Sequence, residues 1–425
     1  MSQKKGNVFA IAIMYFLFFM IAFVTGLQNP MGIIAKAQFG ASNAMSQLGN
    51  FMNFIAYAFL GIPAGLFLKK KGYKVTSLTA VGVGFCGVFV SFLSGVFGNY
   101  WVYLLGALIS GFSMCMLNTI VNPMLNTLGG GGNKGNQLIQ FGGSCNSIGA
   151  TIVPWFAGIL IGDVTAETSI KDVNPALFVA MGIFALAFVI ILLSSIPEPE
   201  LEAAKEAEAR GEKPAEEGVI SSVKGALKHR NLVLGIIAIF VYIGVEVGIP
   251  NIANLYMTTS AAEGGLGLAA GIAGTFVGAY WFLMLVGRLV GGSIGAKVSS
   301  KTMVSTVSIA GITFLLLAIF LPSSLTMTLF KAQVPVSVLF MVLCGLCTSI
   351  MWGAIFNLSV EGLGKYTTIA SGIFMTMVVG GGILPIVQGA VADALGFLNS
   401  YWLIIVYLVY ILWFALVGSR VKKEA

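Results

Sequence analysis

A lone carboxylate, Glu246, lies in the middle of an apolar segment that extends from about residue 231 to about residue 258. A segment of this length can cross a lipid bilayer, which places the carboxylate near the centre of the membrane. An ionised carboxylate at that depth is costly unless it faces water or a partner group. We therefore expect Glu246 to have a functional role, as a proton carrier, as a ligand for Na⁺, or as a hydrogen-bond partner of a ligand.

Amide side chains are the other polar groups of the apolar segments. They are neutral and both donate and accept hydrogen bonds, which suits a ligand with many hydroxyl groups, such as a sugar. Aromatic rings near them could stack on the apolar face of a sugar ring. The candidate binding residues are Gln28, Asn29, Asn118, Asn122, Gln140, Asn146, Glu246, Asn251, Tyr280, Trp352 and Gln388. The alternative is that the amides hold neighbouring helices together.

Two further charged residues, Arg288 and Glu361, lie toward the predicted membrane edge. We expect them to belong to a gate, in which Arg288 bonds loop carbonyls or Glu361. The sequence shows no arrangement for hydrolysis or group transfer, and no cluster of cysteine, histidine and carboxylate residues that would hold a metal. We therefore predict that the chain is not an enzyme and that it needs no cofactor and no metal.

The composition requires a membrane around these groups. The chain of 425 residues is 57% hydrophobic and 9% charged, whereas a soluble domain has about 25% charged residues. The 54 glycines suit helices that pack closely in lipid. The net charge of +7 does not indicate binding to nucleic acid, because the basic residues lie mostly at the ends of the apolar segments. The composition therefore predicts an all-α integral membrane protein.

Twelve apolar segments are long enough to be membrane helices. They extend over about residues 8–35, 43–68, 74–97, 100–127, 134–161, 175–196, 231–258, 269–297, 301–321, 334–360, 366–391 and 397–419. Interruptions are predicted at Pro30, Pro123, Pro154, Pro250 and the glycines that begin at Gly380. Lysine and arginine gather in alternate loops, and this bias assigns those loops and both termini to the cytoplasm.

The twelve helices form two sets of six. We predict a first bundle over residues 1–197, a charged cytoplasmic linker over 198–230, and a second bundle over 231–425. This layout resembles that of the major facilitator fold, whose helices line a central cavity.

Short motifs extend the resemblance to the fucose–proton symporter family, which includes bacterial glucose/galactose transporters. They are Asn118-Thr-Ile-Val-Asn122-Pro123, Gln140-Phe-Gly-Gly-Ser-Cys-Asn146-Ser-Ile-Gly149 and Tyr242-Ile-Gly-Val-Glu246-Val. The chain departs from the family at two places. Gln28-Asn29 stands where the family has an Asn-Asp pair, and Asn118 stands where the fucose branch has a glutamate. Glu246 is then the titratable residue that remains for ion coupling.

The residues and the resemblance together predict a secondary active transporter in the bacterial inner membrane. It would import a monosaccharide, either a hexose or a deoxyhexose such as glucose, galactose, mannose or fucose, by symport with H⁺ or Na⁺. The alternatives are a sugar uniporter without ion coupling and a multidrug exporter of the same fold. The expected partners are the sugar, the coupling cation and the lipid bilayer, and the expected oligomeric state is a monomer.

Overall fold

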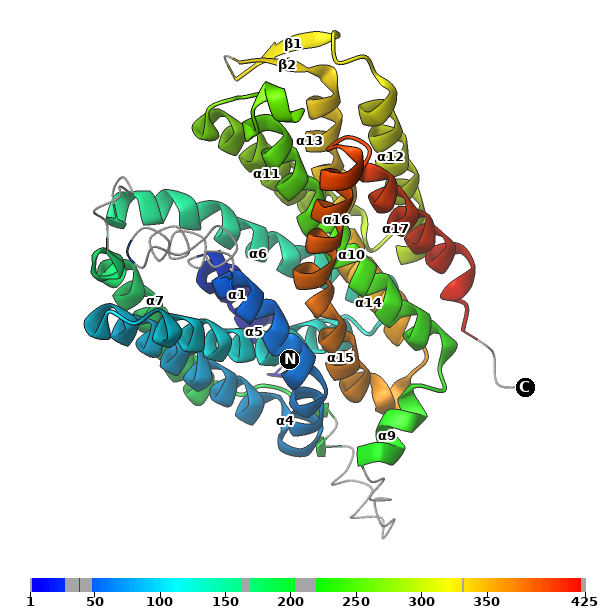
Figure 1. The fold of residues 1–425 in the computed structure, drawn as a ribbon. Coiled ribbons are helices and arrows are strands. Elements are labelled where there is room, and N and C mark those ends of the chain that lie inside the picture. Colours follow the sequence, from blue (N-terminus) through cyan, green and yellow to red (C-terminus); the bar gives the residue numbers. More distant parts are fainter. Residues whose placement is uncertain are drawn as a thin grey trace. The chain divides into compact units, whose positions relative to one another are not determined.

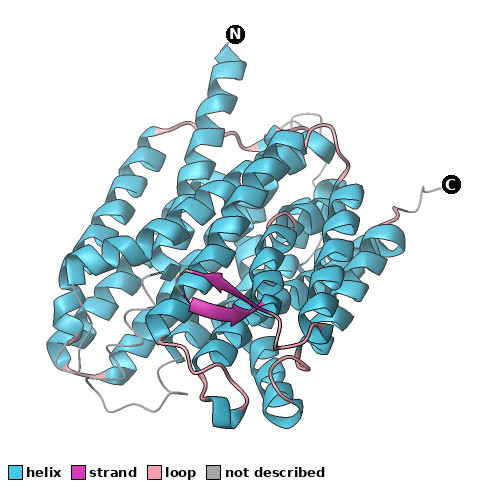
Figure 2. Cartoon of the chain, turned by 90° about the horizontal axis from the view of Figure 1, so that it is seen from above, coloured by secondary structure: helices cyan, strands magenta, loops and turns pink. Residues whose placement is uncertain are grey.

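Helices account for most of the residues that the structure describes, as Figure 2 shows. A computed structural model describes residues 2–26, 38, 48–161, 169–199, 201–202, 219–330 and 332–421. Apolar segments fold into helices in a membrane because a helix satisfies its own backbone hydrogen bonds where no water is available. The predicted fold class, an all-α membrane protein, is confirmed, with one short β-hairpin as an exception.

Ten helical stretches of the described residues are long and apolar enough to cross a membrane. One of them, Phe51–Phe97, has 47 residues. That is about 70 Å of helix, roughly twice the thickness of the hydrocarbon core. It divides at Gly72, whose φ of 81° lies in the left-handed region that glycine favours. With this division, and with the 30-residue helix Gly132–Ile161, the twelve predicted membrane helices are present.

By compactness the chain forms two units, and the first comprises Met1–Gly130, Ile148–His229 and Gly362–Val379. Figure 1 labels its main helices. They are α1 (Ser2–Gly26), α4 (Leu48–Phe97), α5 (Tyr100–Leu128), the later part of α6 (Gly132–Ile161), α7 (Asn174–Leu193), α9 (Val219–Ala226) and α15 (Thr367–Thr376). Three short 3-10 helices, Ile170–Val173, Gly364–Tyr366 and Met377–Val379, also belong to this unit.

Two glycines one turn apart on α4, Gly61 and Gly65, lie against Gly372 of α15. A methyl group added to Gly61 would lie 2.7 Å from the Gly372 carbonyl oxygen, and one added to Gly65 would lie 3.0 Å from the Gly372 Cα atom. Small residues spaced four apart allow membrane helices to approach this closely. The α4 and α15 backbones are therefore in direct contact, which leaves no room for a side chain at these positions.

The carboxylate of Glu198, just beyond the end of α7, caps the part of α4 that follows Gly72. Its two oxygens accept hydrogen bonds from the backbone N–H groups of Tyr73 and Lys74, both at 2.7 Å. A helix N-terminus favours a negative group because its first N–H groups have no partner within the helix. Partial burial raises the pKa of Glu198, and the two backbone donors offset part of that rise. The segment after α7 is thereby fixed to the turn between the second and third membrane helices.

The second unit comprises Gly131–Ser147, Arg230–Glu361 and Gly380–Ala425. Its elements after the first part of α6 are α10 (Arg230–Thr258), α11 (Ala270–Ile294), α12 (Ser300–Phe320), α13 (Val336–Thr348), α14 (Met351–Val360), α16 (Gly380–Leu395) and α17 (Tyr401–Trp413). A 3-10 helix, Ala261–Glu263, follows α10, and a π-helix, Phe414–Gly418, follows α17. Helix α6 and the stretch from α15 to α16 thus each contribute residues to both units.

Two details of the second unit differ from the sequence prediction. The antiparallel strands β1 (Thr326–Leu329) and β2 (Ala332–Pro335) join α12 to α13, and Figure 1 shows this hairpin at the ends of those helices. The predicted helix 334–360 is divided into α13 and α14 at Ser349 and Ile350.

The proline positions also differ from expectation. Helices α5 and α10 continue through Pro123 and Pro250, where interruptions were predicted. A proline removes only one N–H donor, and membrane helices tolerate that loss. Near the predicted interruption at Gly380, by contrast, a 3-10 turn over Met377–Val379 does separate α15 from α16.

The predicted bundle boundaries at residues 197 and 231 stay a prediction. The compact units group the chain differently, because Gly131–Ser147 packs with the later helices and Gly362–Val379 packs with the earlier ones.

Candidate functional site

The break between α13 and α14 exposes three consecutive backbone carbonyl groups. Each accepts a hydrogen bond from the side chain of a different helix. Tyr242 of α10 donates to the Thr348 oxygen at 3.1 Å, Arg288 of α11 donates from Nε to Ser349 at 3.2 Å, and Gln140 of α6 donates from Nε2 to Ile350 at 2.8 Å. Broken membrane helices need such partners because lipid supplies none. The break therefore gathers polar side chains from three helices at one point.

An ion pair between Glu246 and Arg288 adjoins this break. The Nη2 atom of Arg288 lies 3.2 Å from Oε1 of Glu246, and the two side chains are only 9% and 13% exposed, respectively. Glu246 is about 24 Å along α10 from Arg230 and about 18 Å from Thr258, which is the middle of a membrane-spanning helix. Its depth in the membrane stays a prediction, which this position along the helix supports. A charge so placed needs a partner, and Arg288 is that partner.

Arg288 also holds the first part of α6. Its Nη1 atom donates to the Gly143 carbonyl oxygen at 3.1 Å and to Ser147 Oγ at 2.7 Å, and it lies 3.5 Å from Asn146 Oδ1. A methyl group added to Gly143 would lie 3.3 Å from Cδ of Arg288. Gly143 therefore lets the guanidinium lie close along the helix backbone. One arginine joins α6, α10, α11 and the α13–α14 break.

Aromatic residues enclose the ion pair. The Tyr280 hydroxyl donates to the backbone carbonyl of Glu246 at 3.0 Å and lies 2.9 Å from the Thr348 hydroxyl. Trp352 packs edge-on against Tyr242, with ring centroids 6.4 Å apart. Tyr242 and Tyr280 are fully buried, so the pair lies among rings that exclude water and strengthen its attraction.

The gate role expected for Arg288 and Glu361 stays a prediction, but the structure shows which groups Arg288 bonds. Its bonds to the backbone carbonyls of Gly143 and Ser349 are present, although these carbonyls belong to a helix and a helix break and not to a loop. The alternative partner, Glu361, is wrong. Its side chain is exposed, and its backbone carbonyl accepts a bond from Asn231 at 2.8 Å. Glu246 is nearer in space than the sequence could indicate, because α10 and α11 lie side by side.

Two candidate amides of the first unit, Asn118 and Asn122, bond within α5, and Asn118 also bonds α4. Asn118 donates from Nδ2 to the Tyr57 hydroxyl at 2.9 Å and to the Met114 carbonyl at 3.1 Å. Asn122 donates to the Asn118 carbonyl at 2.9 Å. For the donor groups of Asn118 and Asn122, these contacts favour the alternative that the amides stabilise the helices and their packing. Gln28 and Asn29 lie outside the described residues.

Gln388 of α16 differs from Asn118 and Asn122. It is fully buried, and neither amide atom has a hydrogen-bond partner among the described residues. Its Oε1 atom faces Gly248 of α10, where any added side chain would collide with it. An unpartnered buried amide is costly and therefore calls for an explanation. Asn251, one turn further along α10, has an exposed side chain.

Sequence reasoning missed Thr348, Ser349 and Ser147. The signal that could have found the first two is a Thr-Ser pair inside an apolar helix, since these residues bond local carbonyls and compete with regular helix structure. Ser147 follows Asn146 within a motif whose amides suggest ligand binding. For the described residues, no group of three or more histidine, cysteine or carboxylate residues could hold a metal.

Comparison with known proteins gives concordant results. The chain is 29% identical to the glucose/galactose transporter of Brucella abortus, over 99% of this chain and 96% of that protein. It is 23% identical to the L-fucose-proton symporter of Escherichia coli, over 93% of this chain and 89% of that protein.

Solved structures show the same fold. A crystal structure of the Escherichia coli fucose:proton symporter FucP superposes with a TM-score of 0.81 at 21% identity, covering 98% of this chain and all of that one. The proton:xylose symporter XylE superposes with a TM-score of 0.69 at 14% identity, covering 97% and 95%. The family model described as Major Facilitator Superfamily matches residues 11–384. The chain, a multi-pass membrane transporter and not an enzyme, therefore belongs to the Major Facilitator Superfamily.

Proposed function

We propose that this protein imports a monosaccharide across a bacterial inner membrane by cation symport with alternating access. The relatives named as glucose/galactose transporters and L-fucose-proton symporters support a hexose or deoxyhexose as the substrate. The coupling cation is H⁺ or Na⁺. The cytoplasmic location of both termini and the monomeric state remain predictions from the sequence.

The observation that carries the proposal is the shared use of Arg288. When Glu246 is charged and has no cation bound, it attracts Arg288 of α11 toward α10. A cation bound at Glu246 weakens that attraction, because the carboxylate charge is then neutralised by a second partner. Arg288 would still be held by Gly143 and Ser147 of α6. Cation binding at Glu246 thus changes the balance of bonds between α10 and α6.

Helix α6 suits the transmission of such a change. Its first part, through Ser147, packs in the second unit, and its remainder, from Ile148, packs in the first. Alternating access in this superfamily is largely rigid rocking of one bundle against the other. The bonds from Arg288 to the first part of α6 can therefore change the equilibrium between the outward-open and inward-open states.

Gln388 is the strongest remaining candidate for direct contact with the sugar. Its buried amide has no partner in the part of the chain that the structure describes, and a sugar hydroxyl both donates to and accepts from an amide. The remaining binding candidates, Gln28, Asn29, Asn118, Asn122, Gln140, Asn146, Asn251, Tyr280 and Trp352, stay a prediction. Gln140 and Tyr280 have structural bonds at the break that already account for their positions.

A sugar uniporter is the second candidate, and one observation favours it. Arg288 already neutralises Glu246 in this conformation, so the carboxylate needs no cation for its stability. The pair would then be a fixed structural element. A multidrug exporter of the same fold has less support, because the relatives are named as sugar transporters.

Uptake into proteoliposomes separates these functions. Labelled glucose, galactose and fucose are offered with a proton gradient, with a Na⁺ gradient and with neither. We expect one gradient to drive accumulation in the wild type. Glu246→Gln should abolish accumulation but keep counterflow exchange, whereas Asp393→Asn, which removes an exposed carboxylate of α16, should keep both. Sugar entry that never exceeds equilibrium under either gradient would refute symport and support the uniporter.

A further inference from the structure

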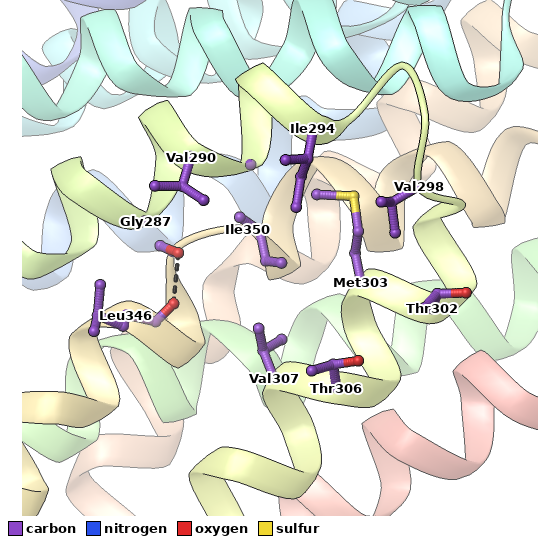
Figure 3. Close-up of a pocket in the computed structure, with 12 residues that line it drawn as sticks. Gly287, Val290, Ile294, Val298, Thr302, Met303, Thr306, Val307, Leu346 and Ile350 are labelled. Atoms are coloured by element: carbon purple, nitrogen blue, oxygen red, sulfur yellow. Dashed lines mark hydrogen bonds between the residues drawn. The ribbon is translucent and has the colours of Figure 1, made fainter.

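A groove of about 270 Å³ lies in the second unit, between α11, α12 and the α13–α14 break. Its walls are Val290 and Ile294 of α11 and Thr306 and Val307 of α12, as Figure 3 shows. Hydrocarbon makes up almost all of the lining, apart from three hydroxyl groups. A sugar would find few hydrogen bonds here, so the groove is unsuited to the proposed transport substrate.

The groove opens toward the bilayer. Val290 and Ile294 are 53% and 40% exposed, and Thr302 and Thr306 are also exposed. All four lie in or at the ends of the membrane-spanning segments Ile272–Ile294 and Ser300–Phe320. The surroundings of the opening are therefore lipid chains. The occupant that matches both lining and opening is a flexible hydrocarbon chain.

Positive charge marks one end of the groove. The loop between α11 and α12 carries Lys297, and Lys301 follows in the first turn of α12. Val298 and Thr302, each next to one of these lysines in the sequence, both line the groove. The α12 N-terminus adds the positive end of a helix dipole at the same place. Basic pockets between membrane helices near the cytoplasmic surface suit anionic lipid headgroups.

The length of the groove agrees with an acyl chain that enters from this end. From Ile294, at the end of α11, to Gly287, deepest on that helix, seven residues correspond to about 10 Å. A chain whose headgroup lies at the loop would thus lie along α11 for about a third of the hydrocarbon thickness. The floor of the groove consists of Ser349 and Ile350, the two residues of the helix break.

We propose that this groove binds one acyl chain of an anionic phospholipid, with its phosphate group at Lys297 and Lys301. The bound chain would pack against the outer side of the α13–α14 break. The inner side of that break bonds Arg288 and Gln140 through the same two residues. The lipid would therefore support the geometry of the site from behind, whatever substrate the protein carries.

The test uses the full chain, purified in detergent and stripped of lipid, with phosphatidylglycerol and phosphatidylcholine of identical chains as probes. Native mass spectrometry measures how tightly each lipid is retained. We expect the wild type to prefer phosphatidylglycerol. Lys297→Gln with Lys301→Gln should weaken phosphatidylglycerol binding about five-fold per lysine. The matched control, Lys70→Gln with Lys71→Gln, removes the same charge from the first unit and should change nothing.

A second pair of variants tests the hydrocarbon part. Thr306→Trp fills the groove and should remove binding of both lipids, whereas Ile309→Trp, exposed on the same helix but outside the groove, should retain it. Val290→Trp, from the opposite wall, repeats the test if Thr306→Trp does not fold. Equal retention of both lipids by the wild type would overturn the proposal. So would full phosphatidylglycerol binding in both tryptophan variants that fill the groove.

Discussion

Because Glu246 and Arg288 form an ion pair, we expect Glu246→Gln to destabilise the wild-type protein but not a protein that already carries Arg288→Met. Arg288→Met leaves the Glu246 carboxylate buried and without its cation. Removing one partner of a buried pair costs about 3–5 kcal/mol, because the remaining charge is uncompensated. Arg288 also loses its bonds to Gly143, Ser147 and Ser349. We therefore expect Arg288→Met to be the most destabilising single change at this site.

Glu246→Gln should cost less in the wild-type background. Arg288 keeps four other acceptors, and the new amide oxygen can still accept one of its N–H groups. The loss is then that of one charge-assisted hydrogen bond, about 1–3 kcal/mol. With Arg288→Met already present, the same substitution removes an unpaired buried charge. It should then be neutral or stabilising, so the double variant is no less stable than Arg288→Met alone.

The measurement is the free energy of unfolding of the four proteins in mixed detergent micelles, followed by circular dichroism. Asp393→Asn, an exposed carboxylate change on α16, is the matched control and should shift stability by less than about 0.5 kcal/mol in both backgrounds. The reasoning is refuted if Glu246→Gln destabilises both backgrounds equally, because the two side chains would then act independently.

Three further predictions concern other parts of the chain. Gly61→Ala should destabilise the protein by about 1–3 kcal/mol, because the added methyl group overpacks against α15. Gly82→Ala on α4, with no atom within 4 Å of the added methyl group, should instead stabilise the protein by about 0.5–1 kcal/mol. The melting temperatures of the two variants test this prediction, and equal shifts would contradict it. Glu198→Ala should cost about 1–2 kcal/mol by leaving two backbone N–H groups without an acceptor. Because the pKa of Glu198 is raised above 4.5 in the folded protein, protonation of Glu198 stabilises the fold fully below pH 4.5, and this stabilisation is lost as the pH rises through the folded-state pKa. The free energy of unfolding of the wild type should therefore fall with pH in this range, and that of Glu198→Ala should lack this fall. The same pH dependence in both proteins would contradict the assignment. Gln388→Leu should stabilise the protein by about 1–3 kcal/mol, because it removes a buried amide without a partner among the described residues. The same substitution should weaken sugar binding measured by calorimetry. Unchanged binding would exclude Gln388 from the sugar site.

The sequence predicts the helices well because hydropathy and length are local properties. The depth of Glu246 follows from the same local pattern. Its partner does not, because Arg288 is 42 residues away and meets it only through the packing of α11 on α10. The predicted membrane edge that Arg288 shares with Glu361 made Glu361 a plausible partner, but a shared edge does not report contact across helices.

The helix break was hidden for a related reason. Ser349 and Ile350 are neither proline nor glycine, so the local sequence offers only the Thr348-Ser349 pair as a signal for an interruption. The break is stabilised by side chains from three other helices, and these become visible only in the fold. The β1–β2 hairpin was missed because strands of four residues are too short to show a clear alternating pattern.

In the proposed function, Glu246 couples sugar movement to a cation. The most direct test is cation flux evoked by sugar in proteoliposomes that start without any gradient, recorded with interior dyes for pH and for Na⁺. We predict that sugar entry draws the coupling cation inward in the wild type and in Asp393→Asn, and that Glu246→Gln admits sugar by exchange without any cation movement. Sugar entry in the wild type without movement of either cation would contradict the account.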